Sequence, residues 1–141
     1  MNKKKTPKSD SLNNQPSTCL SDFFLYADNP KVKEADIDDT KVGKWLLFEN
    51  KERIDELWRI VSSETIKGQL GVSAKVSTFL NPNTTKSYMI CVYTADYTNL
   101  DDVNQVRQQL RELGITQKIP YKTDSATIKG IYGKGSSLYY S

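Results

Sequence analysis

Residues 71–94 read GVSAKVSTFLNPNTTKSYMICVYT, and this stretch decides the fold. In residues 71–78 apolar and polar side chains alternate, which predicts a strand with one buried face and one polar face. Residues 80–87, LNPNTTKS, have the composition of a turn. Residues 88–94, YMICVYT, are rich in β-branched and aromatic side chains, which favours a central strand. The two strands are expected to form an antiparallel hairpin.

The sequence before this hairpin predicts a strand followed by a helix. Residues 43–48, GKWLLF, form a compact apolar run that is typical of a buried strand. Asn50 is suited to cap a helix, because its side-chain oxygen can accept from amides of the first turn. Gly68 is suited to end that helix near Lys67. The apolar stripe of the helix consists of Ile54, Leu57, Trp58 and Val61.

The sequence after the hairpin predicts a second helix and two further strands. Thr98 or Asn99 is expected to cap the helix, and Gly114 to end it. Its apolar face consists of Val103, Val106, Leu110 and Leu113. Two strands are expected after this helix, at residues 117–122 and 138–140, and a further strand is expected near the start of the chain, at residues 22–26. No internal repeat is visible.

These elements follow one another as β, β, α, β, β, α, β, β, which indicates an α+β fold. Two helices with one apolar stripe each are expected to cover one face of a single antiparallel sheet, leaving the other face to solvent or a ligand. Residues 1–20 are polar with little to bury, and we expect a disordered leader there. Residues 21–141 are expected to form one domain.

Composition excludes several classes of function. The chain has no histidine, which removes Ser-His-Asp and Cys-His catalysis and histidine-based metal sites. Two cysteines in unlike contexts predict no metal site and no disulfide framework, and they fit a reduced, cytoplasmic compartment. The sequence contains no run of about 18 apolar residues, so no membrane association is expected. It indicates no cofactor.

Several blocks of sequence, in order, resemble the basophilic leukaemia-expressed protein family. The resemblance covers about residues 22–133. The blocks are GKWLLF at 43–48, GQLGVSAKVST at 68–78, ICVYTADY at 90–97, DDVNQVRQQLRELGI at 101–115, YKTD at 121–124 and GIYG at 130–133.

The resemblance implies a fold similar to that of the cap-binding translation initiation factor 4E. That fold is a curved antiparallel sheet, here of about six strands, with two helices on one face. In the initiation factor, the concave face receives a methylated guanine nucleotide between paired tryptophans. Some bacterial relatives carry a label that suggests likeness to phosphothreonine lyases, which remove phosphate by β-elimination.

Lys75 is the strongest single candidate for a binding residue. It lies in the middle of a predicted strand, on the polar face, between Ser73 and Ser77, and Thr78 ends the strand. An ammonium group flanked by hydroxyls on a rigid sheet can receive a phosphate or carboxylate. The alternative is a solvated polar face whose lysine has no ligand. If the helices cover Ile90 and Val92, Tyr93 joins Lys75 on the open face.

A second polar cluster lies near the end of the sequence. Tyr121, Lys122 and Asp124 surround a predicted strand end, and Tyr132 follows in a glycine-rich segment whose backbone amides could approach an anion. Residues 117–141 contain four lysines and one aspartate, a net charge of +3. This is weaker than the basic stripe of a duplex-DNA binder. A loop without a ligand is the alternative.

Two other residue types have structural interpretations. Trp58 falls on the apolar stripe of the first helix, so core packing is expected, whereas the face of Trp45 is left open. Cys91 has no histidine to activate it, and a buried structural cysteine is expected.

We therefore expect the open concave face to bind a phosphorylated ligand, a nucleotide or an RNA end. The candidate binding residues are Lys75, Ser77, Thr78, Tyr93, Tyr121, Lys122, Asp124 and Tyr132. The alternative is a phosphothreonine lyase-like enzyme that uses Lys75 or Lys122 as its base. A protein-interaction module on the helices is disfavoured, because their outer faces are charged.

Overall fold

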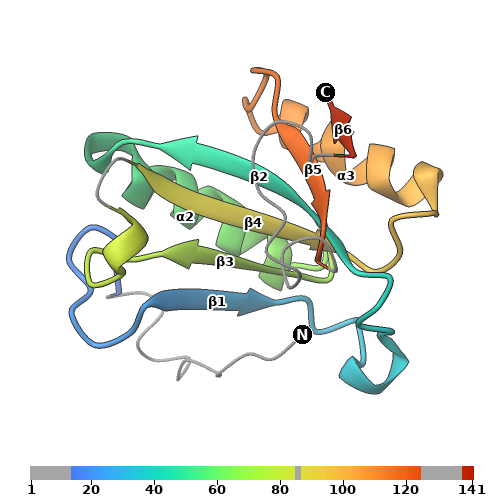
Figure 1. The fold of residues 1–141 in the computed structure, drawn as a ribbon, viewed down its shortest axis with the longest axis horizontal. Coiled ribbons are helices and arrows are strands. Elements are labelled where there is room, and N and C mark those ends of the chain that lie inside the picture. The colour runs from blue at the N-terminus through green and yellow to red at the C-terminus, as the bar shows by residue number, and fades with distance from the viewer. Residues whose placement is uncertain (1–13, 85–86, 125–137) are drawn as a thin grey trace.

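A computed structural model of the chain describes residues 14–84, 87–124 and 138–141 (Figure 1). Within the described residues the fold has six strands and two α-helices, with two single-turn 3-10 helices in the connections. The elements are β1 (Phe24–Asp28), η1 (Glu34–Asp36), β2 (Gly43–Glu49), α2 (Lys51–Ile66), β3 (Ser73–Ser77), η2 (Pro82–Thr84), β4 (Tyr88–Thr94), α3 (Leu100–Glu112), β5 (Pro120–Thr123) and β6 (Tyr139–Tyr140).

The strands form one sheet in the order β1-β3-β4-β2-β5-β6, and every neighbouring pair is antiparallel. The predicted α+β class and the predicted hairpin of β3 and β4 are confirmed. The sequence left the order of the strands open. In the structure β1 pairs with β3, and β2 pairs with β4 and β5.

Both helices begin and end as their sequences predict. The Asn50 side chain accepts from the amide of Arg53 at 3.1 Å at the start of α2. Asn99 caps α3 in the same way. Gly68, which follows the last residues of α2, has a φ of +78°, a backbone conformation that favours glycine. These local signals set the lengths of the helices.

Both helices pack on one face of the sheet, which we call the covered face. Figure 1 views the sheet from the opposite side, with α2 behind the strands. Apolar side chains of α2 and α3 meet those of the central strands in one continuous core. Its most buried members include Trp45, Leu47, Ile54, Val61, Val76, Ile90, Val92, Val103 and Leu110. The predicted arrangement of two helices on one face is therefore confirmed.

Residues 14–20, which the sequence assigns to the leader, contact the domain. The backbone amide and the hydroxyl of Ser17 both donate to the carboxylate of Asp55 on α2. The amide of Phe79 donates to the carbonyl of Pro16 at 2.8 Å. The packed part of the chain thus includes residues before position 21. Residues 1–13 of the expected leader lie outside the described residues.

Among the described residues, no helix combines the length and apolar character that crossing a membrane requires.

Candidate functional site

The open face is the side of the sheet opposite α2 and α3, and the strand register arranges its side chains in three rows. The aromatic row, at one end, consists of Phe24, Ser77, Met89 and Phe48. The middle row consists of Tyr26, Lys75, Cys91 and Leu46. The lysine row, at the other end, consists of Asp28, Ser73, Tyr93, Lys44 and Lys122. The face therefore changes from aromatic to cationic along the strands. Most side chains of the middle and lysine rows are nevertheless buried, so the sequence-based expectation of a face left to solvent does not hold there; the buried ones are Leu46, Cys91, Ser73, Tyr93, Lys44 and Lys122.

In the lysine row, the charge of Lys44 is neutralised by an ion pair. Its Nζ donates to Oδ1 of Asp124 at 2.8 Å, and the two side chains are 6% and 17% exposed. The same ammonium lies 5.8 Å from the ring centroid of Tyr93. Asp124, predicted as a binding residue, thus binds a lysine of the same face.

Burial governs the protonation of the other groups around this pair. Burial, and then the neighbouring charge of Lys44, lower the pKa of Lys122. Burial raises the pKa of Tyr93 far above its ordinary value, and it also raises the pKa of the Cys91 thiol. Tyr93 and Cys91 therefore hold their protons at neutral pH. The buried, free thiol of Cys91 agrees with the structural role expected from the sequence.

Lys75, in the middle row, lies half-buried on β3 beside Cys91 of β4. Its Nζ lies 4.2 Å from the ring centroid of Phe24 in the neighbouring strand, a cation–π contact. Among the described residues, no carboxylate lies within ion-pair distance of this Nζ. Within the described part of the chain, Lys75 is thus a lysine whose charge is not paired with a carboxylate.

Ser77 shares the open face with Lys75, but its oxygen already has a partner. Its Oγ accepts from the backbone amide of Met89 at 2.9 Å, just beyond the last paired residues of β3 and β4. The hydroxyl hydrogen of Ser77 is still free to donate to a ligand.

Thr78 and Tyr121 do not reach the open face. Thr78 follows Ser77, so its buried side chain points the other way and donates to the carbonyl of Asp22. Tyr121 packs against Trp45 on the covered face, with ring centroids 5.0 Å apart. Its ring crosses β2 at Gly43, where a side chain would collide with it, and its hydroxyl bonds Thr94 at 2.6 Å. Burial raises the pKa of Tyr121 to about 12.

Tyr132, the remaining predicted binding residue, lies outside the described residues, as do Lys129 and Lys134. Of the predicted site residues, the structure brings Lys75, Ser77, Tyr93, Lys122 and Asp124 to the open face or its edge.

Both tryptophans of the chain lie on the covered face. Trp45 is 1% exposed, and its Nε1 donates to the carbonyl of Val103 at 3.1 Å. Trp58 is 6% exposed within the core, as its helical spacing predicts. Neither indole can stack on a ligand at the open face.

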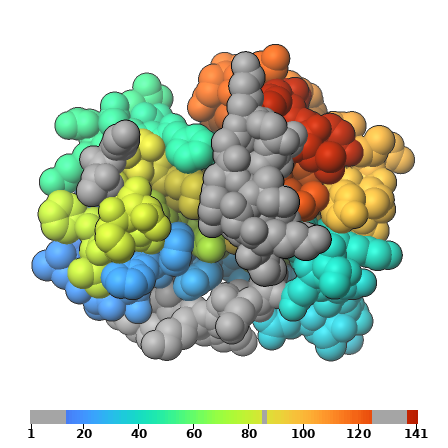
Figure 2. Space-filling view, viewed as in Figure 1, coloured from blue at the N-terminus to red at the C-terminus, as the bar shows by residue number. Residues whose placement is uncertain are grey.

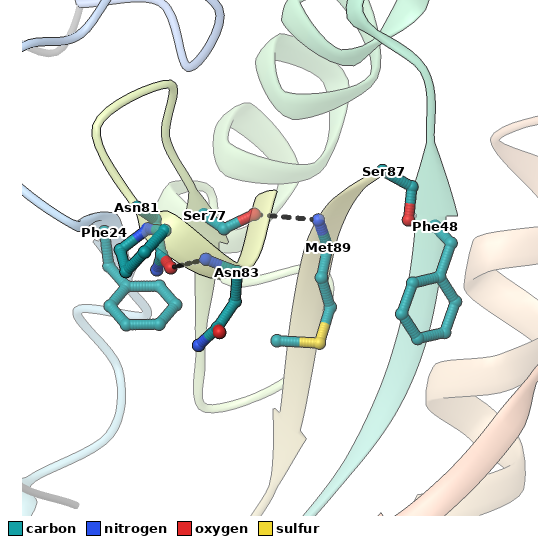
Figure 3. A pocket seen from close by; sticks show the side chains of 8 residues that line it. Phe24, Phe48, Ser77, Asn81, Asn83, Ser87 and Met89 are labelled. Carbon is teal, nitrogen blue, oxygen red and sulfur yellow. Dashed lines mark hydrogen bonds between the residues drawn. The ribbon is translucent and has the colours of Figure 1, made fainter. Parts of the chain in front are cut away.

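A pocket of about 300 Å³ lies at the aromatic row. Figure 3 shows the rings of Phe24 and Phe48 on its two sides, with the side chains of Met89 and Asn83 between them. In the space-filling view of this face, the gold atoms of β4 lie between the yellow-green connection after β3 and the teal strand β2 (Figure 2). The lining residues are Phe24, Phe48, Ser77, Asn81, Pro82, Asn83, Ser87 and Met89.

The two asparagines of this pocket differ in what they offer a ligand. Both ends of the Asn81 amide are used, since Nδ2 donates to the carbonyl of Phe23 and Oδ1 accepts from the amide of Asn83. The side-chain amide of Asn83 makes no hydrogen bond in the described structure. It therefore presents one donor group and one acceptor to the pocket.

Sequence reasoning missed Lys44, Phe24, Phe48 and Asn83 as site residues. Residues 43–48 were interpreted as one buried run, although alternation places Trp45 and Leu47 on one face and Lys44 and Phe48 on the other. That alternation was the available signal. For Asn83, in a turn, the sequence offered none.

Groups of three or more His, Cys, Asp or Glu side chains placed to hold a metal ion are not found in the described part of the chain.

Solved structures of similar fold include eIF4E proteins, several of them in complex with a cap or a cap analog. The eIF4E-3 of C. elegans, in complex with the 4E-binding protein Mextli and a cap analog, is 17% identical, with a TM-score of 0.66 over 94% of this chain and 78% of that one. The eIF4E-3 of Ascaris suum with an m2,2,7G cap is 17% identical, with a TM-score of 0.61 over 94% and 77%. A schistosome eIF4E with m7GpppA and 4E-BP is 14% identical, with a TM-score of 0.57 over 84% and 69%. At these identities the likeness shows the fold.

The sequence itself identifies the family. The family model described as basophilic leukemia-expressed protein Bles03 matches residues 24–128, which run from the start of β1 to beyond β5. This range contains three quarters of the chain and all the described residues of the three rows. The chain therefore belongs to the basophilic leukemia-expressed protein Bles03 family.

Proposed function

We propose that the open face of this protein binds a small phosphorylated ligand, a nucleotide or an RNA end, through Lys75. The observation that carries the proposal is the state of that lysine. Lys44 is paired with Asp124 and Lys122 is buried, whereas Lys75 is half-buried and meets no carboxylate among the described residues. A charge-assisted bond to phosphate is the strongest contact that such a group can make.

The sheet holds this ammonium in place before a ligand arrives. Lys75 stands on β3, which is paired on both sides, and the ring of Phe24 supports its charged end. The hydroxyl hydrogen of Ser77, two residues further along the strand, lies on the same face. Side chains fixed on rigid strands lose little conformational entropy on binding.

The comparisons support a nucleotide over other phosphorylated compounds. The structures of similar fold contain a cap analog, an m2,2,7G cap and m7GpppA. The same sheet geometry in this chain offers an open face with a cation and an aromatic pocket next to each other. This combination suits a phosphate joined to a flat base.

Isothermal titration calorimetry with GTP, ATP and tripolyphosphate tests the proposal. We expect Lys75→Ala to weaken GTP binding roughly tenfold or more, since a hydrogen bond to a charged group is worth about 1.5–3 kcal/mol. Lys67→Ala is the matched control, because this lysine lies exposed at the end of α2. Equal affinity of the Lys75→Ala and unchanged proteins, or no binding to either, would refute the proposal.

A second candidate is an enzyme that eliminates phosphate from phosphothreonine with a lysine as base. The lowered pKa of Lys122 supports it, because a neutral amine is required to remove the α-proton. Elimination converts phosphothreonine to dehydrobutyrine and inorganic phosphate. Mass spectrometry of a phosphothreonine peptide, incubated with high concentrations of the protein, detects this loss of phosphoric acid. No product with the unchanged protein, or equal product with Lys122→Met, would remove this candidate.

A further inference from the structure

The pocket at the aromatic row has a chemistry that selects among nucleotides. We infer that it holds the base of the phosphorylated ligand, and that it takes a neutral base rather than a guanine that carries a positive charge through N7-methylation. This inference rests on the proposed function and names the ligand class of the same face. Its four supports are the pocket's shape, its position next to Lys75, its charge and its hydrogen-bonding groups.

The shape suits a flat ring. The pocket has a volume of about 300 Å³, at the lower end of the range for small-ligand sites. The phenyl rings of Phe24 and Phe48 flank it, and the Met89 side chain lies between them (Figure 3). Aromatic faces and a polarizable thioether are favourable contacts for the faces of a base. Phe48 is 50% exposed, so its ring is accessible to a ligand.

The pocket lies close enough to Lys75 for a nucleotide whose base occupies the pocket to place its phosphates on this lysine. Phe24 belongs to both parts of the site, since its ring lines the pocket and also contacts the Lys75 ammonium at 4.2 Å. Ser77, which lies between Phe24 and Met89 in the aromatic row, joins the pocket to the middle row. A ligand with its base against Phe24 therefore has its phosphate within reach of the cation.

The charge of the pocket disfavours a cationic base. Its lining residues include no carboxylate, and the nearest described charge in contact with a lining ring is the ammonium of Lys75. Asp22 precedes Phe24 by two residues, but it does not line the pocket, and its carboxylate accepts from the hydroxyl of Ser21. The ring of Phe24 already binds one cation. A methylated base would meet a like charge without a counter-ion.

The free amide of Asn83 can read the edge of the base. It offers a donor and an acceptor, which is the pairing that asparagine makes with neutral bases. A carboxylate at this position would instead favour a cationic ring. A substitution of Asn83 can thus change the preference between neutral and cationic bases. It should leave the turn intact, because the hydrogen bond to Asn81 Oδ1 comes from the backbone N–H of Asn83.

Calorimetry of the full chain with GTP, N7-methyl-GTP and tripolyphosphate tests the inference. We expect GTP to bind at least as tightly as N7-methyl-GTP, and tripolyphosphate to bind roughly tenfold more weakly than GTP, because stacking on one aromatic ring has about that effect. Phe48→Ala should lower the affinity for GTP to that for tripolyphosphate and leave tripolyphosphate binding unchanged. Phe48→Tyr keeps the ring and should bind GTP normally.

Two further variants separate the pocket from its surroundings. Phe79→Ala removes an exposed ring that does not line the pocket and should leave GTP binding unchanged. Asn83→Asp places a carboxylate at the exposed edge of the pocket and should shift the ratio of affinities toward N7-methyl-GTP by roughly twofold to fivefold, the effect of one exposed ion pair. An unchanged ratio would refute the role given to Asn83.

The outcomes distinguish this inference from the proposed function. If N7-methyl-GTP binds the unchanged protein tenfold more tightly than GTP, the charge argument is wrong while the phosphate site stands. If Phe48→Ala binds GTP normally but Lys75→Ala does not, the base lies elsewhere and the phosphate site again stands. If neither nucleotide nor tripolyphosphate binds, the proposed function fails together with the inference.

Discussion

The two faces of the sheet are made by the same strands, yet they differ in composition and in what their side chains contact. On the covered face Leu47, Ile90 and Val92 are fully buried against the helices, in a continuous apolar core. On the open face the same strands carry Lys44, Phe48 and polar groups. The buried apolar cluster described on this face is small and consists of Val42, Leu46, Cys91 and Tyr93. The difference indicates that the covered face supplies most of the stability, whereas the ligand binding proposed above would use the cationic and polar groups of the open face.

The largest difference between the two faces is expected when one aromatic residue on each face of β2 is truncated. Trp45→Ala should lower the free energy of unfolding by about 3–5 kcal/mol, because it empties a core site and frees the Val103 carbonyl. Phe48→Ala should cost about 1 kcal/mol or less, since half of that ring already meets water. Urea denaturation measures both, and equal losses would contradict the assignment of stability to the covered face.

The ion pair of the lysine row tests how much a buried contact on the open face contributes to stability. Lys44→Ala should cost about 3 kcal/mol, since it leaves the Asp124 carboxylate mostly buried without a partner. The double variant Lys44→Met, Asp124→Leu should recover at least half of that loss. A double variant that is as unstable as Lys44→Ala would show that the packing of the lysine stem, rather than its charge, is what matters.

Alkaline pH provides a third way to test the open face. In the unfolded chain the Tyr93 phenol loses its proton near its ordinary pKa of 10.0, whereas burial keeps it protonated in the folded chain. The folded chain then binds more protons, so the free energy of unfolding falls as pH rises above about 10, by up to about 1.4 kcal/mol per pH unit for this group.

Tyr93→Phe removes this proton and should make the decline with pH shallower by that amount. Urea denaturation at pH 8, 10 and 11 is the measurement, with Tyr97→Phe as the control because Tyr97 lies outside the three rows and is half-buried. Identical slopes for Tyr93→Phe and the unchanged protein would mean that Tyr93 is not buried.

The smallest expected effect on stability is that of Lys75. Lys75→Ala removes one cation–π contact and should change the free energy of unfolding by less than about 1 kcal/mol. The same change is expected to weaken GTP binding roughly tenfold or more. A large loss of stability would assign Lys75 to the structure of the sheet rather than to a ligand.

Much of the fold could be predicted because its signals are local. Asn50 and Asn99 cap the helices, Gly68 and Gly114 follow them with positive φ, and alternation in residues 71–94 defines the hairpin. The order of the strands in the sheet could not be predicted in this way, because strands that are distant in sequence can pair as well as strands that are adjacent. Nothing local indicates that β1 pairs with β3.

Site residues could be predicted only in strands whose apolar and polar residues alternate clearly in the sequence. Lys75 and Tyr93 were placed on the open face by the alternation of β3 and β4. The same alternation would have put Thr78 on the other side, had it been carried one residue further. Tyr121 belongs to a four-residue strand, too short for its pattern to define a face. The pocket needs β1, β2 and a turn, which only the folded chain brings together.

The position of the two tryptophans decides which spectroscopic signals report on which event. Trp45 of β2 and Trp58 of α2 are buried between the sheet and the helices, and Trp45 touches Arg107 and Tyr121 rather than the open face. Their emission should therefore change on unfolding and stay constant when a ligand occupies the open face. Tryptophan fluorescence is thus expected to report folding rather than occupancy of the open face, so a variant can be checked for its fold in the presence of the nucleotide that it is meant to lose.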